Sequence, residues 1–244
     1  EYEIVHDGLI NWPPWYPQWS EEPVEKSIHV VSVPADMQVR HYARGLETEP
    51  EIRKSRKRTI FRWRTGMLPA REVEPYGPAW SIQAPSVLIA PKIFEIAGYR
   101  GDMSTWQSFG QWYQTFAESC LTLPPSALSE ITAIIESAAT PRETVQKLYA
   151  HLQEKTRYVS VQLGIGGWQP FCPEYVYERS YGDCKALSNY MIAMLKAAGV
   201  QAYPTLIRTG TRAPEIPADF SYNPFNHMIV CVPLEQDTLW LECT

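Results

Sequence analysis

Several signals that usually reveal a metal site or a membrane protein are absent from these 244 residues. No two cysteines have the CxxC spacing and no two histidines have the HxxxH spacing, so a structural zinc site is not expected. No calcium loop of the DxDxDG type occurs, and we expect no metal or other cofactor. No apolar run approaches the roughly 18 residues of a membrane-spanning helix, so no integral membrane segment is expected in this chain.

The composition is that of a globular protein, with 45% hydrophobic and 20% charged residues. The chain is long enough for one large domain or two ordinary ones. Its formal net charge of −5 gives no reason to expect a nucleic acid as partner, and nothing in the composition predicts an oligomeric state. The chain starts at Glu1 without a signal-peptide pattern, so its N-terminus does not predict a compartment.

The cysteines are odd in number and show no spacing typical of a disulfide framework. At least one thiol is therefore expected to be free or paired between chains. The five residues are Cys120, Cys172, Cys184, Cys231 and Cys243.

Residues 1–100 contain most of the prolines and several short runs of β-branched, aromatic and alternating residues. These runs are EYEIVH, SIHVVSV, QVRHYA, RTIFRWR and SVLIAP, and proline or glycine separates them. The pattern predicts a small antiparallel β-sandwich domain. Because the chain opens directly on a strand-like run, the sandwich is expected to lack strands that precede it.

Residues 101–244 change to a helical period and then return to strands. The segments STWQSFGQWYQTFAES and SALSEITAIIESAA predict two helices. A third helix, in TPRETVQKLYAHLQEKTRY, has a capping box of Thr140 and Glu143, with Pro141 at its first position. The strands RYVSVQL, QAYPTLIRT, NHMIVCV and TLWLECT are predicted around and after a further helix. This order predicts an α+β domain that begins near residue 101.

Two other segments have a structural and a binding interpretation. RKSRKRTIFRWR holds seven basic residues and no acidic one, which suits either a solvated sheet face or an anionic ligand. NWPPWYPQW places aromatic residues between prolines, as in a sugar or proline-rich peptide site. We expect the structural interpretation in both cases: a solvated loop and strand face, and a connection that covers one end of the sandwich.

Cys184 stands at the start of a predicted helix in YGDCKALSNYMIAMLKAAGV. Gly182 and Asp183 precede it as a turn residue and an N-cap, apolar residues follow at helical spacing, and Gly199 ends the pattern. Backbone N–H groups at a helix start lower a cysteine pKa and can stabilise an oxyanion. Cys184 is therefore a candidate nucleophile, although a buried structural cysteine has the same pattern.

His227 and Glu242 are predicted to share one face of a hairpin. His227 begins the strand HMIVCVP, and the short turn PLEQD leads into TLWLECT. If the loop holds an even number of residues, Glu242 lies directly opposite His227 or on the adjacent diagonal. An odd number would place it on the other face. A carboxylate beside the imidazole would orient it as a base.

These stretches resemble the bacterial transglutaminase-like superfamily, whose members share a papain-like Cys, His, Asp core. The resemblance rests on GGWQPFCPEYVYERSYGDCKALSNYMIAMLKAAGVQAYPTLIRTG, FNHMIVCVP and LWLECT, and covers residues 104–244 with the preceding helices. The first hundred residues resemble the β-rich domain of unknown function that often precedes such domains in bacteria. The junction phrase GYRGDMSTWQSFGQWY fits the same arrangement.

The resemblance implies catalytic roles for three residues. Cys184 becomes the nucleophile and His227 its base, while Glu242 takes the position at which most relatives have aspartate. The longer side chain departs from that pattern and leaves its geometry open. An oxyanion donor commonly lies upstream of the cysteine, and the candidates here are Trp168, Gln169 and Gln162.

The implied reaction is cysteine acyl transfer on an amide bond of a peptide or protein substrate. Hydrolysis as a peptidase or amidase is the preferred interpretation, and transfer to an amine is the other enzymatic one. A catalytically idle domain that binds peptides or cell-envelope material is the alternative, and a carbohydrate-binding module has only the aromatics of NWPPWYPQW in its favour. The resemblance also implies a periplasmic or extracellular location at the bacterial cell envelope.

Overall fold

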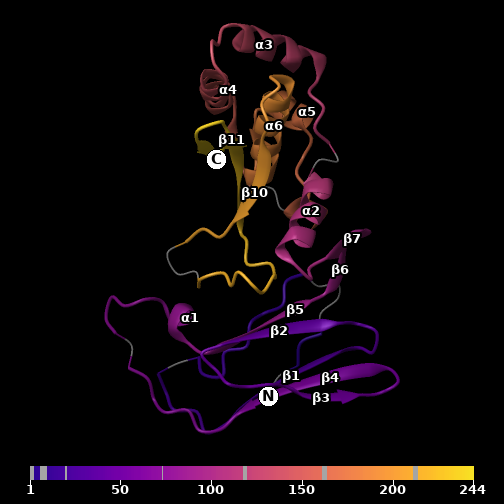
Figure 1. Cartoon of the computed structure of the whole chain (residues 1–244), viewed down its shortest axis with the longest axis vertical. Helices are drawn as coiled ribbons and strands as arrows, with labels where there is room; N and C mark the ends of the chain where they lie inside the picture. The colour runs from indigo at the N-terminus through magenta and orange to yellow at the C-terminus, as the bar shows by residue number, and fades with distance from the viewer. Residues whose placement is uncertain are drawn as a thin grey trace. The chain divides into compact units, whose positions relative to one another are not determined.

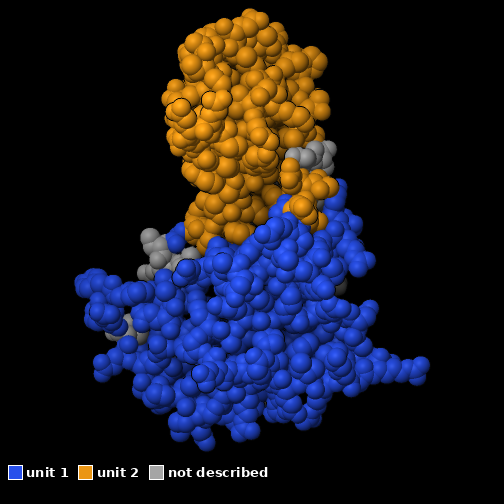
Figure 2. All heavy atoms as spheres, viewed as in Figure 1, with its two compact units in different colours: residues 1–110, 210–224 blue, residues 111–209, 225–244 orange. Residues whose placement is uncertain are grey.

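The structure is a computed structural model that describes residues 3–5, 10–19, 21–72, 74–117, 120–160, 164–210 and 214–244. It divides into two compact units, coloured separately in Figure 2. Unit 1 comprises residues 1–110 and 210–224, and unit 2 comprises residues 111–209 and 225–244. The domain boundary near residue 100 stays a prediction.

Unit 1 is built from antiparallel sheets (Figure 1). The first has the order β1-β4-β3, with strands Ser27–Pro34, Arg58–Thr65 and Glu51–Lys54. The second pairs β2 (Val39–Arg44) with β5 (Ser86–Pro91), and the third pairs β6 (Ile93–Ile96) with β7 (Tyr99–Asp102). A short helix, α1 (Trp80–Gln83), precedes β5. Four of the five predicted strand runs are found, but Glu3–Val5 of the first run form no strand.

The core of unit 1 lies between the first two sheets, as a sandwich requires. Strand β4 alternates strictly, with Phe61 and Trp63 buried and the residues between them exposed. They pack with Val87 and Ile89 of β5, and Trp63 is fully buried. Period-two alternation with one buried face is the reason these residues form strands rather than helices.

The aromatic segment NWPPWYPQW belongs largely to this core. Trp15 exchanges backbone hydrogen bonds with Val87, at 2.9 and 2.8 Å, and its side chain is 6% exposed. Tyr16 is buried as well, whereas Trp19 is 68% exposed. The segment therefore closes the sandwich, as its structural interpretation predicted.

The basic run lies on exposed parts of β3, β4 and the turn between them. Arg53 pairs with Glu51, and Arg58 donates hydrogen bonds to the hydroxyl and carbonyl oxygens of Ser32. These contacts are those of a solvated sheet face.

Unit 2 consists of helices packed on a three-stranded antiparallel sheet, so the α+β prediction is confirmed (Figure 1). The sheet has the order β10-β11-β12, with strands Tyr203–Ile207, His227–Pro233 and Thr238–Leu241. The helices are α2 (Trp106–Ala117, which begins in unit 1), α3 (Pro125–Glu136), α4 (Pro141–Lys155), α5 (Pro173–Arg179) and α6 (Cys184–Ala197). None of the helices in the described ranges is long and apolar enough to cross a membrane.

Helix α4 begins as its sequence predicts. The Thr140 hydroxyl accepts a hydrogen bond from the Glu143 backbone N–H at 3.2 Å, and the Glu143 carboxylate accepts one from the Ala139 N–H at 2.8 Å. The glutamate thus reaches one residue further back than a standard capping box requires. Of the strand predicted after this helix, β8 covers only Arg157–Tyr158 and pairs in parallel with β9 (Tyr181–Gly182), while residues 161–163 lie outside the described residues.

Helix α6 is the centre of the unit 2 core. Its first twelve residues, from Cys184 to Leu195, are all buried. It packs against β10 and β11 and against α3, α4 and α5, with Leu187, Met191 and Met194 in one cluster with Val230. A helix surrounded on all sides needs mostly apolar residues around its circumference, and most residues of this helix are apolar.

A disulfide joins Cys120 to Cys172, 52 residues apart, which the spacing of the cysteines did not indicate. The two cysteines lie after α2 and before α5, and only the folded chain brings them together. Asn189 of α6 donates hydrogen bonds to the Cys120 and Phe171 carbonyls, at 2.8 and 3.3 Å. The remaining three cysteines are free, as the odd number predicted for at least one of them.

Removing this disulfide is expected to destabilise unit 2. Because a cross-link over 52 residues restricts the unfolded chain, a Cys120→Ser/Cys172→Ser variant should lose about 2–4 kcal/mol of unfolding free energy in a denaturant titration. Cys231→Ser, which removes a half-buried free thiol, is the matched control. An unchanged denaturation midpoint in the double variant under oxidising conditions would contradict the expectation.

Candidate active site

Cys184 is the first residue of α6, and the two residues beside it are charged and buried. The Asp183 side chain caps the helix by accepting a hydrogen bond from the Ala186 N–H at 2.9 Å. Its other carboxylate oxygen pairs with the Lys185 ammonium. The side chains of Asp183 and Lys185 are 1% and 7% exposed. One ion pair is therefore formed at the helix start, with its acidic member before the cysteine and its basic member after it.

The Cys184 thiol lies in a small apolar cluster and is 5% exposed. Tyr113 and Ala117 of α2 and Met228 of β11 are the other buried members. Trp112, Trp168 and Leu206 pack against them. The cysteine is therefore covered by side chains from four separate segments: α2, β10, β11 and the stretch around Trp168.

Burial decides the pKa of this thiol. Desolvation raises the pKa of Cys184, and the Asp183 carboxylate adds to the increase. The Lys185 ammonium and hydrogen bonds from the backbone N–H groups of Met228 and Lys185 act in the opposite direction, without overcoming it. The prediction that a helix start alone lowers this pKa was wrong, because the same position is also buried.

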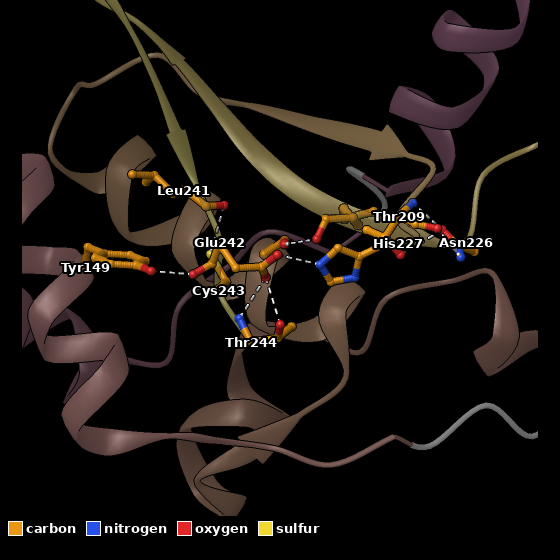
Figure 3. Close-up of polar contacts among 10 residues, drawn as sticks. Tyr149, Thr209, Asn226, His227, Leu241, Glu242, Cys243 and Thr244 are labelled. Carbon is orange, nitrogen blue, oxygen red and sulfur yellow. Dashed lines mark hydrogen bonds and ion pairs between the residues drawn. The ribbon is translucent and has the colours of Figure 1, made fainter. Parts of the chain in front are cut away.

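The hairpin places His227 and Glu242 as its sequence predicts. Strands β11 and β12 pair Val230 with Leu241 and Pro233 with Thr238, which leaves an even-numbered turn of four residues. Continuing this register puts Glu242 on the diagonal from His227, on the same face. The His227 Nε2 and Glu242 Oε2 atoms are 2.7 Å apart, and Figure 3 shows the two side chains pointing toward each other.

Thr244 holds the second oxygen of the Glu242 carboxylate. The Thr244 backbone N–H and hydroxyl donate to Glu242 Oε1 at 3.1 and 2.8 Å, and the Tyr149 hydroxyl donates to the Glu242 backbone carbonyl (Figure 3). Burial raises the pKa of Glu242, but hydrogen bonds from His227 and Thr244 outweigh it, so the net pKa is lowered. The carboxylate is thus fixed on both oxygens, which offsets the freedom of its additional methylene.

Cys184 packs against the start of β11, where His227 and Met228 are the first two residues. The backbone N–H of Met228, the residue after His227, donates to the cysteine sulfur. Within the described ranges no hydrogen bond joins that sulfur to the His227 ring. His227 and Glu242 are therefore in direct hydrogen-bond contact, whereas Cys184 contacts Met228, the residue that follows His227.

Of the predicted oxyanion donors, Trp168 packs against the Cys184 cluster. Gln169 follows it in the chain and is half-buried, and Gln162 lies outside the described residues. The sequence interpretation missed Tyr113 and the Asp183–Lys185 pair. The only signal for the pair was the pattern of opposite charges around Cys184, and Tyr113 was one of several aromatic residues in a predicted helix.

The chain has recognisable relatives at the level of family and fold. Residues 130–242 match the sequence profile of the transglutaminase-like superfamily. A search of curated proteins found no match. Among solved structures, a proposed protease from Parabacteroides distasonis superposes with a TM-score of 0.65 at 13% identity, over 96% of this chain and 44% of that one. This chain thus spans less than half the length of that relative.

Two further structures match more distantly. A proposed cysteine protease from Cytophaga hutchinsonii has a TM-score of 0.40 at 10% identity, over 94% of this chain and 69% of that one. The periplasmic domain of TgpA from Pseudomonas aeruginosa has a TM-score of 0.36 at 14% identity, over 96% of this chain and 75% of that one. The family profile covers α4, α5, α6 and the three-stranded sheet, which hold Cys184, His227 and Glu242. The match to the transglutaminase-like superfamily therefore includes all three of these residues.

Proposed function

We propose that this chain is a cysteine acyl-transfer enzyme that hydrolyses amide bonds of peptides or proteins. Cys184 is the nucleophile, His227 the base and Glu242 the residue that orients the histidine. The observation that carries the proposal is the 2.7 Å His227–Glu242 pair, next in the chain to Met228, which packs in one cluster with the helix-start cysteine. Nucleophile, base and orienting acid are the groups that acyl transfer requires.

The reaction proceeds through a thioester. The His227 ring takes the proton of the Cys184 thiol, and the sulfur attacks the amide carbonyl carbon. The C–N bond then breaks, and His227 returns the proton to the departing amine. Water attacks the thioester with His227 as its base, the C–S bond breaks, and the acid and the free thiol remain. Since Glu242 holds Nε2, the other ring nitrogen, Nδ1, is the one to exchange protons with the sulfur.

Trp168 is the proposed oxyanion donor. It packs against the cluster around Cys184, and its indole N–H can donate to an oxygen bound near the sulfur. The Met228 and Lys185 backbone N–H groups act to lower the Cys184 pKa and would favour the same developing negative charge.

One observation favours a second function. Cys184 is 5% exposed, and its pKa is raised, as in a structural cysteine. If the cover made by Tyr113, Ala117 and Trp168 does not open, the domain is catalytically idle and serves to bind peptides or cell-envelope material. The two functions differ in one measurable property, the reactivity of the Cys184 thiol.

We also propose a periplasmic or extracellular location. The Cys120–Cys172 disulfide supports it, because such bonds form and persist in oxidising compartments and are rare in the cytosol.

The reactivity of Cys184 toward iodoacetamide tests the catalytic proposal. In the wild-type protein we expect alkylation near pH 7 through a thiolate–imidazolium pair. In His227→Ala the imidazole is gone and burial keeps the thiol pKa raised, so the rate at pH 7 should fall at least about tenfold and recover only at alkaline pH. Peptide mass spectrometry follows each cysteine separately against pH.

Cys231 and Cys243 are the internal controls, because both are free and neither lies in the Cys184 cluster. The pKa of Cys243 is raised to about 12 by burial, so it should stay unmodified at pH 7. A wild-type Cys184 that reacts no faster than Cys243, with or without His227, would refute the enzyme and favour the binding domain.

Glu242 substitutions test the orienting role. Glu242→Gln keeps the shape but removes the charge beside His227, so kcat should fall about 10–10⁴-fold with little change in KM. Glu242→Asp retains the charge and should keep more activity than Glu242→Gln. Equal loss in both variants would contradict the role of the carboxylate charge.

The same pair has a pH signature in stability. Because the pKa of Glu242 is lowered in the folded protein, its contribution is fully present above its ordinary pKa of 4.5 and is lost as pH falls through the lowered value. Unfolding titrations of the wild type and Glu242→Gln should therefore converge in acid. If the wild type and Glu242→Gln still differ in unfolding free energy in acid, the His227–Glu242 pair is not the source of that difference.

Two Trp168 variants separate its packing from its hydrogen bond. Trp168→Phe keeps an aromatic cover but removes the indole N–H, so kcat should fall about 10²-fold while Cys184 alkylation stays unchanged. Trp168→Ala removes the cover as well and should also speed alkylation. Unchanged kcat in Trp168→Phe would eliminate the indole as oxyanion donor.

A further inference from the structure

The ion pair of Asp183 and Lys185 is the most deeply buried pair of opposite charges among the described residues. Its two side chains are 1% and 7% exposed, whereas every other ion pair of the described ranges has at least one partner more than a third exposed. It also brackets Cys184 in the sequence and in the first turn of α6.

Stability does not explain such a pair. Removing two charges from water costs several kcal/mol per ion, and their mutual attraction seldom does more than offset it. The helix cap does not require it either. Asp183 Oδ1 accepts the Ala186 N–H, and an asparagine side chain could do the same. The ammonium of Lys185 therefore adds a buried positive charge that the fold does not need for its helix.

The surroundings of Cys184 contain few other charges. On α2, Tyr113 faces both Cys184 and Asp183, which contribute to its raised pKa after burial. On β11, His227 precedes the Met228 peptide that donates to the sulfur. Lys185 is thus the permanent positive charge next to the thiol, and Asp183 is the negative one that holds the lysine in place.

We propose that Lys185 is a positioning residue whose buried ammonium stabilises the Cys184 thiolate, with Asp183 as the anchor that fixes the ammonium beside the sulfur. This inference rests on the proposed function, in which Cys184 acts as a thiolate. Burial opposes that state, and the Lys185 charge is the contribution from α6 side chains that favours it. The anchor has a cost, because the Asp183 carboxylate itself disfavours a second negative charge nearby.

Three variants isolate the charge of Lys185 from its shape. Lys185→Met keeps most of the side chain and removes the ammonium, so Cys184 alkylation at pH 7 should slow about tenfold, which corresponds to one pKa unit. Lys185→Arg keeps the charge and should stay within about threefold of the wild type. In Asp183→Asn/Lys185→Met both charges are gone, so the rate should fall between those of the wild type and Lys185→Met.

The measurement is the pH profile of iodoacetamide alkylation at Cys184, followed by peptide mass spectrometry, with the thermal midpoint of each variant recorded in parallel. A purely structural role would lower the thermal midpoint without moving the profile. The proposal is overturned if Lys185→Met has the wild-type profile, or if Lys185→Arg loses as much as Lys185→Met. It is also overturned if the double variant recovers the full wild-type rate, because the unpaired Asp183 would then explain the effect.

The wild type and His227→Ala separate this proposal from the catalytic one. If His227 has no effect on Cys184, the catalytic proposal fails. The Lys185 variants still report on the thiol through its alkaline titration, where Lys185→Met should require a higher pH than Lys185→Arg. If His227 has its effect and the Lys185 variants match the wild type, only the positioning role fails.

Discussion

The burial of the first turn of α6 is the constraint on which the rest of unit 2 depends. This helix is enclosed by α3, α4, α5 and the sheet, and its buried residues extend to its first position. A helix start carries unsatisfied N–H groups, which need partners when water is excluded. Asp183 satisfies one of them, and Lys185 neutralises the charge that Asp183 brings. Cys184 is therefore placed in a site that is dry and electrostatically prepared.

Much of this arrangement could be predicted because it depends on local patterns. The α4 cap, the extent of α6 and strands β1, β2, β4, β5, β10, β11 and β12 follow from spacing and from residue preferences over short segments, whereas the short strands β3, β6 and β7 were not predicted. The position of Glu242 relative to His227 follows from parity alone. A turn of four residues fixes which side chains share a face, whatever the rest of the fold does.

The features that could not be predicted depend on contacts distant in sequence. Cys120 and Cys172 pair because α2, α5 and Asn189 of α6 meet in space, and a separation of 52 residues says nothing about that. The pKa of Cys184 has the same origin. Its position in the helix was correctly inferred, but the desolvation that reverses the effect comes from Tyr113, Ala117 and Trp168, which lie on other segments.

The burial of Cys184, which raises the thiol pKa, also affects how strongly nearby charges act on the thiol. A dry site strengthens each charge interaction, so the same burial that disfavours the thiolate also increases the influence of Lys185 and His227 on it. Burial alone would slow oxidation as well as alkylation, because both follow thiolate character and exposure. The reactivity of the Cys184 thiol therefore depends on His227 and Lys185 as well as on its exposed fraction, and the exposed fraction alone does not decide between the two functions.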